Sequence, residues 1–332
     1  MALRWGIASS GKIANDFVTG IKGLPASEHQ VVAIAARSLA SADKFAKTHN
    51  IPKAYEGYEQ LAKDADVQVV YVGVLNPQHY EVVLLLLNHG KHVLCEKPFA
   101  INHKQAKEMI DLAKKKNLFV MEAIWSRCFP VYREVRKLLD EGVLGEVKYA
   151  AVDFGFPIAD VDRIKNKDLG GGAILDLGIY ILQFQQFVFR GLKPVKVLAS
   201  GHLNDGGVDD SASAILTYPN GKTAVVTCNA TAQMTNEGVI IGTKGTIRIP
   251  MFWCPTSYSL NGQVKEFPLI ENNGNFNYIN SAGLGYEAAD VRKTILSGKI
   301  ESEQVTHEET LQLAAWLDTL RKETGVVFPA DS

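Results

Sequence analysis

Lys97 and Tyr180 have side chains that together suit acid–base chemistry at a hydroxyl group. Lys97 lies in the segment Glu96-Lys97-Pro98, and Tyr180 lies in an apolar stretch further along the chain. A tyrosine with an ordinary pKa of about 10 is a poor base at neutral pH, but an adjacent ammonium stabilises the phenolate and lowers that pKa. We predict that Tyr180 exchanges the proton of an alcohol, while Lys97 lowers the pKa of Tyr180 and orients the alcohol.

Asp176, Tyr180 and Gln183 interrupt a run of Ile, Leu and Phe. Their spacing of i, i+4 and i+7 places them on one face of a helix predicted over Ala173–Phe189. We expect Asp176 to anchor a neighbouring hydroxyl of the substrate. The alternative is that Asp176 caps the helix and that Tyr180 is a partly buried core residue.

The position of Lys97 follows from the strand predicted over His92–Cys95. The carboxyl ends of parallel strands form the edge at which open α/β sheets bind ligands. Pro98 restricts the residue before it to extended conformations, which would direct the Lys97 side chain toward the cleft. A solvated Glu–Lys pair is the alternative.

A glycine-containing turn follows the strand predicted over Arg4–Ala8 and opens a helix. It has the pattern Gly-x-Ala-x-x-Gly, a variant of the dinucleotide fingerprint, in which the helix N-terminus offers N–H groups to a pyrophosphate. The alternative is an ordinary strand-to-helix turn. The predicted cofactor contacts in this turn are Gly6, Ala8, Ser10, Gly11, Lys12 and Ile13.

Arg37 and Ser38 stand at the end of the strand predicted over Val31–Ala36, where NAD enzymes usually carry an acidic residue. A cation and a hydroxyl suit a 2′-phosphate, so the sequence favours NADP. The alternative is an exposed arginine at the start of a helix. The residues predicted to complete the cofactor site are Asn76, Pro77, His79, Glu96 and Lys97, although His79 would equally suit a surface position in the first turn of a helix.

These residues depend on a regular order of elements, in which short β-rich runs alternate with amphipathic helices up to about Trp125. Such alternation is typical of βαβ units and a parallel sheet. Longer strands predominate after Gly142 and suggest a mostly antiparallel sheet, with helices near Tyr286–Ser297 and His307–Glu323. The fold class is therefore α/β, with an N-terminal Rossmann domain over 1–122 and a C-terminal α+β domain with a large, mostly antiparallel sheet over 123–332.

Composition favours a globular protein that acts on a small molecule. The chain has 332 residues and a formal net charge of −1, which favours two domains and gives no sign of binding to nucleic acid or an anionic membrane. The strand-like start at Arg4–Ile7 leaves no leader, so we expect a cytoplasmic protein. No metal-binding pattern is present, and the four separated cysteines argue against disulfides and structural zinc.

The order of the motifs resembles the glucose-fructose oxidoreductase and inositol dehydrogenase family over essentially the whole chain. The resemblance rests on the Gly6–Gly11 turn, Asn76-Pro77-x-His79, Glu96-Lys97-Pro98 and Asp176-x-Gly178-x-Tyr180-x-x-Gln183. The segments Met121-Glu122-Ala123-Ile124-Trp125 and Trp253-Cys254-Pro255-Thr256 resemble a diol- and sugar-oxidising branch of that family. The resemblance implies oxidation of a vicinal diol or cyclic sugar, with Lys97 and Tyr180 in the catalytic centre.

The same resemblance suggests an aromatic wall and a homodimer formed through the C-terminal sheet. Aromatic faces suit the apolar side of a sugar or an aromatic diol, although each of these residues taken alone is more typical of a core. The predicted wall consists of Trp125, Phe154, Trp253 and Phe276, beside Asp176 and Tyr180.

Three other functions fit parts of the sequence. Hydride transfer is reversible, so an NADPH-dependent reductase of a keto-sugar or dicarbonyl is one alternative. A non-enzymatic regulator that senses a dinucleotide is another, but it would not need both Lys97 and Tyr180. A purely structural protein would leave the polar face around Asp176 unexplained.

Overall fold

The computed structural model describes residues 2–332, which form two compact units. The first unit contains the chain up to Ala100, Lys104–Cys128 and Leu269–Thr310, and the second contains Ile101–His103, Phe129–Pro268 and Leu311–Ser332. The structure differs from the predicted division after residue 122, because Leu269–Thr310 returns to the first unit. In that segment α9 (Leu284–Leu296) packs against α1 (Lys12–Ile21), a contact that chain order does not reveal.

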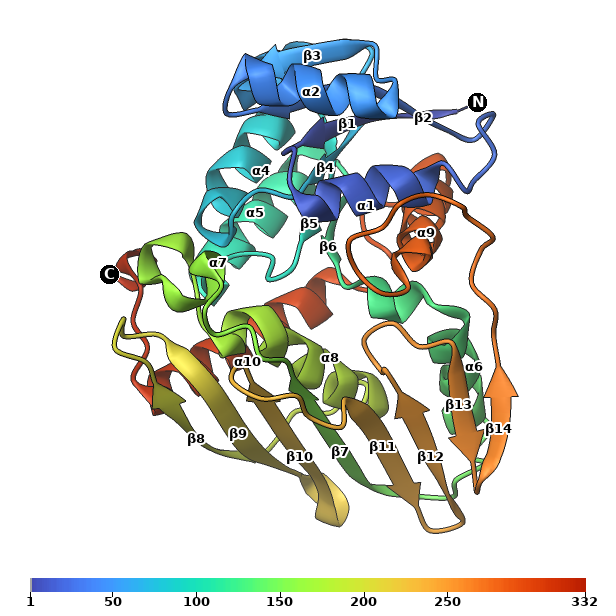
Figure 1. Ribbon diagram of the computed structural model, residues 1–332. Helices are drawn as coiled ribbons and strands as arrows, with labels where there is room; N and C mark the ends of the chain where they lie inside the picture. Colours follow the sequence, from blue (N-terminus) through green and yellow to red (C-terminus); the bar gives the residue numbers. More distant parts are fainter. Residues whose placement is uncertain (1) are drawn as a thin grey trace. The chain divides into compact units, whose positions relative to one another are not determined.

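The first unit is built on a six-stranded parallel sheet of Rossmann topology, with helices on both faces (Figure 1). Its strand order is β3-β2-β1-β4-β5-β6, so successive strands are added on one side of β1 up to β3 and on its other side from β4 onward. The strands are β1 (Leu3–Ala8), β2 (His29–Ala36), β3 (Lys53–Glu56), β4 (Val69–Val72), β5 (His92–Glu96) and β6 (Val120–Ala123). Besides α1 and α9, its helices are α2 (Leu39–His49), α3 (Tyr58–Lys63), α4 (His79–Asn88) and α5 (His103–Lys116), of which His103 belongs to the second unit.

The predicted parallel sheet is confirmed, and burial explains the composition of its strands. All four residues of β4 are buried, as expected for a strand covered by helices on both sides. Strand β3, at the edge of the sheet, was not predicted, because Lys-Ala-Tyr-Glu is too short and polar to resemble a buried strand.

The second unit is built on an eight-stranded sheet with the order β14-β13-β12-β11-β7-β10-β9-β8. Neighbouring strands are antiparallel except for β7 and β10, which confirms the prediction of a mostly antiparallel sheet. The strands are β7 (Val147–Gly155), β8 (Lys196–Leu203), β9 (Asp209–Tyr218), β10 (Lys222–Asn229), β11 (Glu237–Gly242), β12 (Gly245–Pro250), β13 (Ser257–Leu260) and β14 (Gln263–Glu266). The helices are α6 (Pro130–Asp140), α7 (Asp162–Lys165), α8 (Ile179–Val188) and α10 (His307–Thr324), of which α10 joins this unit from Leu311.

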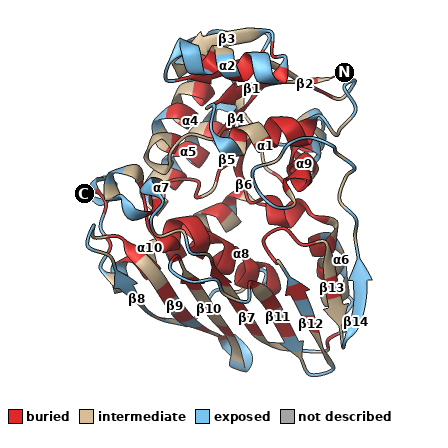
Figure 2. Cartoon of the chain, in the orientation of Figure 1, coloured by how far each residue is buried: buried red, intermediate tan, exposed pale blue. Residues whose placement is uncertain are grey.

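The two faces of this sheet have different surroundings. Every residue of α8 is buried, and the helix packs against β7 and β10 (Figure 2). Gly238 of β11 allows the close approach of Phe184, since a Cβ atom at Gly238 would lie 2.5 Å from the Phe184 ring. Buried residues alternate along β9 and β10 with residues that are half-buried or exposed, so the opposite face of the sheet is open to solvent.

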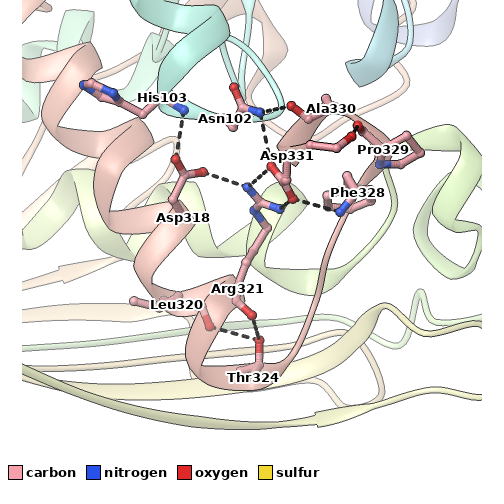
Figure 3. A network of polar contacts seen from close by, with 11 residues as sticks. Asn102, His103, Asp318, Leu320, Arg321, Thr324, Phe328, Pro329, Ala330 and Asp331 are labelled. Atoms are coloured by element: carbon pink, nitrogen blue, oxygen red, sulfur yellow. Dashed lines mark hydrogen bonds and ion pairs between the residues drawn. The ribbon is translucent and has the colours of Figure 1, made fainter.

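A polar network ties the end of the chain to the segment Ile101–His103 (Figure 3). The Arg321 side chain is buried, and its guanidinium donates to Asp318 at 2.7 Å and to Asp331 at 2.7 and 3.1 Å. Asp318 also accepts from the backbone N–H of His103 at 3.0 Å, and Asp331 accepts from the Asn102 side chain at 3.1 Å. Arg321 therefore bridges two carboxylates that hold the same short segment.

None of the described helices is long and apolar enough to cross a membrane. The cysteines at 95, 128, 228 and 254 are buried free thiols. Within residues 2–332, no group of His, Cys, Asp and Glu side chains is arranged to hold a metal ion.

Candidate active site

The turn between β1 and α1 has the geometry expected of a phosphate-binding turn. Gly11 is the N-cap of α1 and places no side chain over the first N–H groups of the helix. Ser9 adopts a left-handed conformation, with φ of 127°, and its hydroxyl accepts from the N–H of Gly11 at 3.1 Å. Ser10, Gly11 and Lys12 are exposed, so this turn fits a dinucleotide pyrophosphate.

Gly6 is required for close packing around β1. A Cβ atom at this position would lie 2.9 Å from the side chains of Leu61 and Val67. Gly6 therefore lets α3 and the segment before β4 pack closely on β1. The sequence assigned both glycines to the approach of a cofactor, but the structure gives Gly6 this packing role as well.

The carboxyl end of β2 presents Arg37 and Ser38 at the surface. Arg37 is exposed and Ser38 is the N-cap of α2, where its hydroxyl accepts from the N–H of Ser41 at 3.3 Å. A cation beside the N-terminus of a helix is a suitable environment for a phosphate group. The residues at this strand end thus fit a dinucleotide that carries a 2′-phosphate.

His79 is fully buried, which rules out the surface position considered from the sequence. Its Nδ1 lies 2.8 Å from the carbonyl oxygen of Pro98, and its Nε2 lies 3.1 Å from that of Val74. Two carbonyl acceptors favour a doubly protonated ring, but burial lowers the pKa of His79. We assign a neutral ring with the proton on Nδ1, the closer contact, and a structural role, since no His79 atom reaches the surface. Asn76 and Pro77 are half-buried in η1 (Asn76–Gln78) and remain predicted cofactor contacts.

Lys97 follows β5 directly, at the carboxyl edge of the parallel sheet. Its peptide bond to Pro98 is cis. The side chain of Glu96 is buried, accepts from the Tyr71 hydroxyl at 2.5 Å and accepts from the N–H of Lys97 at 3.3 Å. The alternative of a solvated Glu–Lys pair is therefore wrong for Glu96.

The segment with Asp176 and Tyr180 was predicted to be one continuous α-helix, but the structure shows two kinds of helix there. Residues Ile174–Gly178 form a π-helical turn, and α8 begins at Ile179. The wider turn alters the angular offset between Asp176 and Tyr180, and such turns are frequent at functional sites. Gln183, which was predicted to share their face, is fully buried and donates to the Tyr132 hydroxyl at 2.9 Å.

Asp176 does not cap its helix, so that alternative is wrong. The N–H of Ile174 instead donates to Asp209 of β9 at 2.6 Å. Burial raises the pKa of Asp209 to about 6.

Asp176 forms an ion pair with Arg163, whose guanidinium lies 2.7 Å away and whose side chain is 41% exposed. No sequence pattern marks Arg163, because it lies in the short helix α7, well before Asp176 in the chain.

An aromatic cluster surrounds Tyr180 in the second unit. The ring of Phe154 lies with its centroid 5.3 Å from that of Tyr180 and 4.8 Å from that of Trp253. Phe156 and Phe252 also pack against Phe154 and were missed, since nothing in their spacing separates them from ordinary core residues. Three residues of the predicted site are therefore neighbours.

The other two predicted wall residues, Trp125 and Phe276, belong to the first unit. Trp125 is buried in η2 (Trp125–Cys128), and Phe276 is half-buried before α9. Their contribution to a substrate pocket remains a prediction.

Comparison with known proteins agrees with both halves of this architecture. Residues 3–124 match the family model described as an oxidoreductase family with an NAD-binding Rossmann fold, and residues 132–248 match the C-terminal domain model of the same family. The chain belongs to the GFO/IDH/MocA oxidoreductase family. The family predicted from the motifs is therefore confirmed, and so is a Rossmann domain of the NAD(P)-binding type.

Curated relatives in this family match over their full length. The trans-1,2-dihydrobenzene-1,2-diol dehydrogenase of Danio rerio is 46% identical over 333 residues, which cover 100% of both chains. The enzyme of the same name from Sus scrofa is 47% identical and covers 100% of this chain and 99% of its own.

Solved structures of similar proteins share the fold. A 3-ketoreductase from Actinomadura kijaniata, in complex with NADP and TDP-benzene, has a TM-score of 0.83 at 26% identity and covers 99% of both chains. An aldose-aldose oxidoreductase from Caulobacter crescentus, complexed with glycerol, has the same TM-score at 25% identity and covers 98% of both chains.

Proposed function

We propose that this protein oxidises a vicinal diol or cyclic sugar, of the trans-dihydrodiol or D-xylose type, with NADP as cofactor. The observation that carries the proposal is the position of Tyr180, whose ring packs edge-on against Phe154 in an aromatic cluster. A phenol among aromatic faces suits a substrate that has hydroxyl groups and an apolar or aromatic side. The relatives named trans-1,2-dihydrobenzene-1,2-diol dehydrogenase support this substrate class.

The chain's own residues divide the chemistry. Tyr180 accepts the hydroxyl proton as the alcohol becomes a carbonyl, and the Lys97 ammonium stabilises the phenolate and holds the alcohol oxygen. Asp176, fixed by Arg163, accepts a hydrogen bond from the neighbouring hydroxyl. The Gly6–Gly11 turn, Arg37 and Asn76 hold the cofactor, which supplies the acceptor for the hydride that leaves carbon.

A second candidate is the reverse reaction, reduction of a keto-sugar or dicarbonyl. The solved 3-ketoreductase that binds NADP favours it. Structures of that enzyme also exist for variants in which a lysine or a tyrosine is replaced. The same two side chains serve both directions, because the proton that Tyr180 accepts in oxidation is returned in reduction.

The proposal is tested by assaying the purified protein on trans-dihydrodiols and cyclic sugars with NADP and NAD in parallel. We expect oxidation with NADP to have the higher kcat/KM. Replacement of the exposed Arg37 by glutamine should raise the KM for NADP by about 10–100-fold and leave that for NAD nearly unchanged, since a charge-assisted phosphate contact is lost. Arg190→Gln, an exposed arginine of the second unit, is the control. A wild-type preference for NAD would overturn the role of Arg37.

We also propose that the open face of the eight-stranded sheet joins two copies of the chain. Strand register places Leu198, Ile215, Val225, Ala151 and Val239 side by side in one row across β8, β9, β10, β7 and β11. Leu198 is 52% exposed and Ile215 is 44% exposed. A continuous apolar row of this kind on a sheet is typical of a protein interface.

Sedimentation should give a mass near twice the chain's 36.3 kDa. The substitution Ile215→Lys should raise the dimer dissociation constant at least about tenfold, because it places a charge within the apolar row. Leu296→Lys, at an equally exposed position on α9, should leave it unchanged. A monomeric wild-type protein would contradict this proposal.

A further inference from the structure

The peptide group between Pro98 and Phe99 is held from both sides by buried side chains. Its carbonyl oxygen lies 2.8 Å from Nδ1 of His79 on α4, and its N–H donates to Oε1 of Glu122 on β6 at 2.9 Å. The Sγ of Cys95 on β5 lies 3.8 Å from the next carbonyl, that of Phe99. Three elements of the parallel sheet and its helices thus fix the loop that begins at Lys97.

Glu122 is an unusual partner for this loop. Its side chain is 2% exposed, and among the described residues its Oε2 atom is buried without a hydrogen-bond partner. A buried carboxyl with one unpartnered oxygen costs stability, so the contact that it does make calls for an explanation. Its Oε1 atom accepts a hydrogen bond from the Phe99 N–H, two residues after Lys97.

The register of the sheet explains why Glu122 reaches this loop. Glu122 pairs with Cys95 across β5 and β6, so the two side chains project from the same face of the sheet. The chain turns back over that face after Glu96, which brings the Phe99 backbone to both of them. Because β6 is a buried strand, the carboxyl is held on a rigid element.

We propose that Glu122 is a positioning residue that fixes the Pro98–Phe99 peptide and thereby the direction in which the backbone presents Lys97. The inference deepens the proposed function, since it relies on that function for the role of Lys97. Glu122 itself contacts the loop, so its effect on the reaction passes through Lys97.

The charge state of Glu122 gives this arrangement a pH dependence. Burial raises the pKa of Glu122 to about 7, and the charge of Glu96 adds to the rise; the Phe99 N–H, the Thr310 hydroxyl and the Lys97 ammonium oppose it. The other groups that face this region are the Cys95 thiol and, across the peptide, His79. An ionised carboxylate accepts a stronger hydrogen bond than a neutral carboxyl, so the loop is held more firmly as the pH rises through about 7.

Stability changes in the opposite direction. Because the pKa of Glu122 is raised in the folded protein, its contribution is fully present below the ordinary value of 4.5 and is lost as the pH rises toward about 7. Ionisation of Glu122 near neutral pH therefore lowers the free energy of unfolding while it strengthens the hydrogen bond to the loop.

The test compares Glu122→Gln, which keeps an acceptor but cannot ionise, with Glu122→Asp, which keeps the carboxyl but withdraws it by one methylene. We expect Glu122→Gln to lower kcat about tenfold, and Glu122→Asp to lower it by about 10–100-fold, because a displaced catalytic group loses orientation. The wild-type rise in kcat near pH 7 should disappear in Glu122→Gln and persist in Glu122→Asp. NADP affinity, measured by fluorescence, should stay within about twofold of the wild-type value.

The matched control is Glu303→Gln, the same substitution at a residue whose side chain is 69% exposed. Unchanged kcat and an unchanged pH profile in Glu122→Gln would overturn the proposal. It would also be overturned if both Glu122 variants lost NADP binding and secondary structure together, since Glu122 would then serve stability alone.

A second readout does not depend on catalysis. Hydrogen exchange at the Phe99 N–H should become about tenfold faster in Glu122→Gln than in the wild-type protein at pH 8, because the amide loses a charge-assisted bond. If the protein oxidised no diol or sugar but showed this change, the proposed substrate would be wrong and the hold on the loop would stand. Unchanged exchange at Phe99 would contradict the hold itself.

Discussion

Replacing Tyr180 with phenylalanine is expected to lower kcat by about 10²–10⁴-fold, the range for loss of an acid–base group. The substitution keeps the ring that packs against Phe154 at 5.3 Å, so the aromatic cluster should survive. Only the hydroxyl that we propose to exchange the proton is lost. The measurement is steady-state kinetics with a diol or sugar and NADP, together with circular dichroism to confirm that the variant folds.

Tyr258→Phe is the control for this prediction, since Tyr258 is a buried tyrosine of β13 that packs against Phe267. We expect it to retain wild-type turnover. The KM for NADP should be unchanged in Tyr180→Phe, because the cofactor is held by residues of the first unit. Turnover of Tyr180→Phe within about twofold of the wild-type value would exclude Tyr180 as the essential acid or base.

The substitution Arg321→Leu should reduce the free energy of unfolding by about 3 kcal/mol, the lower end of the range for breaking a buried ion pair. The lower end applies because Asp318 and Asp331, the two carboxylates that Arg321 bridges, are 33% and 22% exposed. Arg321→Lys keeps the charge but not the paired geometry, so its free energy of unfolding should lie between those of the wild-type protein and Arg321→Leu. The measurement is urea-induced unfolding of the whole chain.

The pH dependence of this loss distinguishes an electrostatic effect from a packing effect. Burial raises the pKa of Asp331, but its hydrogen bonds to Arg321, the Phe328 N–H and Asn102, together with the charge of Arg321, outweigh burial and hold that pKa below the ordinary 3.8. The stabilisation by the pair is therefore present above about pH 4 and lost as the pH falls through the pKa of Asp331. Lys322→Leu, on the exposed side of the same helix, should have little effect. A loss in Arg321→Leu that is equally large at pH 3 and pH 7 would contradict the ion-pair account.

The sequence predicts the elements of this fold well where burial imposes a pattern. The strands of the parallel sheet and the helices between them were found from their apolar runs, because both faces of that sheet are covered. The edge strands β3 and β14 were missed, and so was β13, the short strand next to β14. All four residues of β14 are exposed, so no alternation marks it as a strand.

The site was predicted less completely than the fold. The residues found from sequence, Lys97, Asp176 and Tyr180, stand out because they are polar in apolar surroundings or follow a strand. Arg163, Asp209 and Glu122 contact segments that are separated from them in the chain, and no local spacing marks them. Helix periodicity also gives no sign of the π-helical turn at Ile174–Gly178, whose backbone bonds depend on tertiary packing.

The return of Leu269–Thr310 to the first unit sets the order in which the chain can fold during synthesis. Helix α9 packs against α1, yet more than two hundred residues of intervening chain leave the ribosome between the two. The second unit's strands, all of which precede residue 269, can pair while the first unit still lacks one of its layers. During synthesis the surface of α1 that α9 covers therefore stays exposed until α9 has been made. We expect a ribosome-bound fragment that ends before α9 to bind chaperones for this reason.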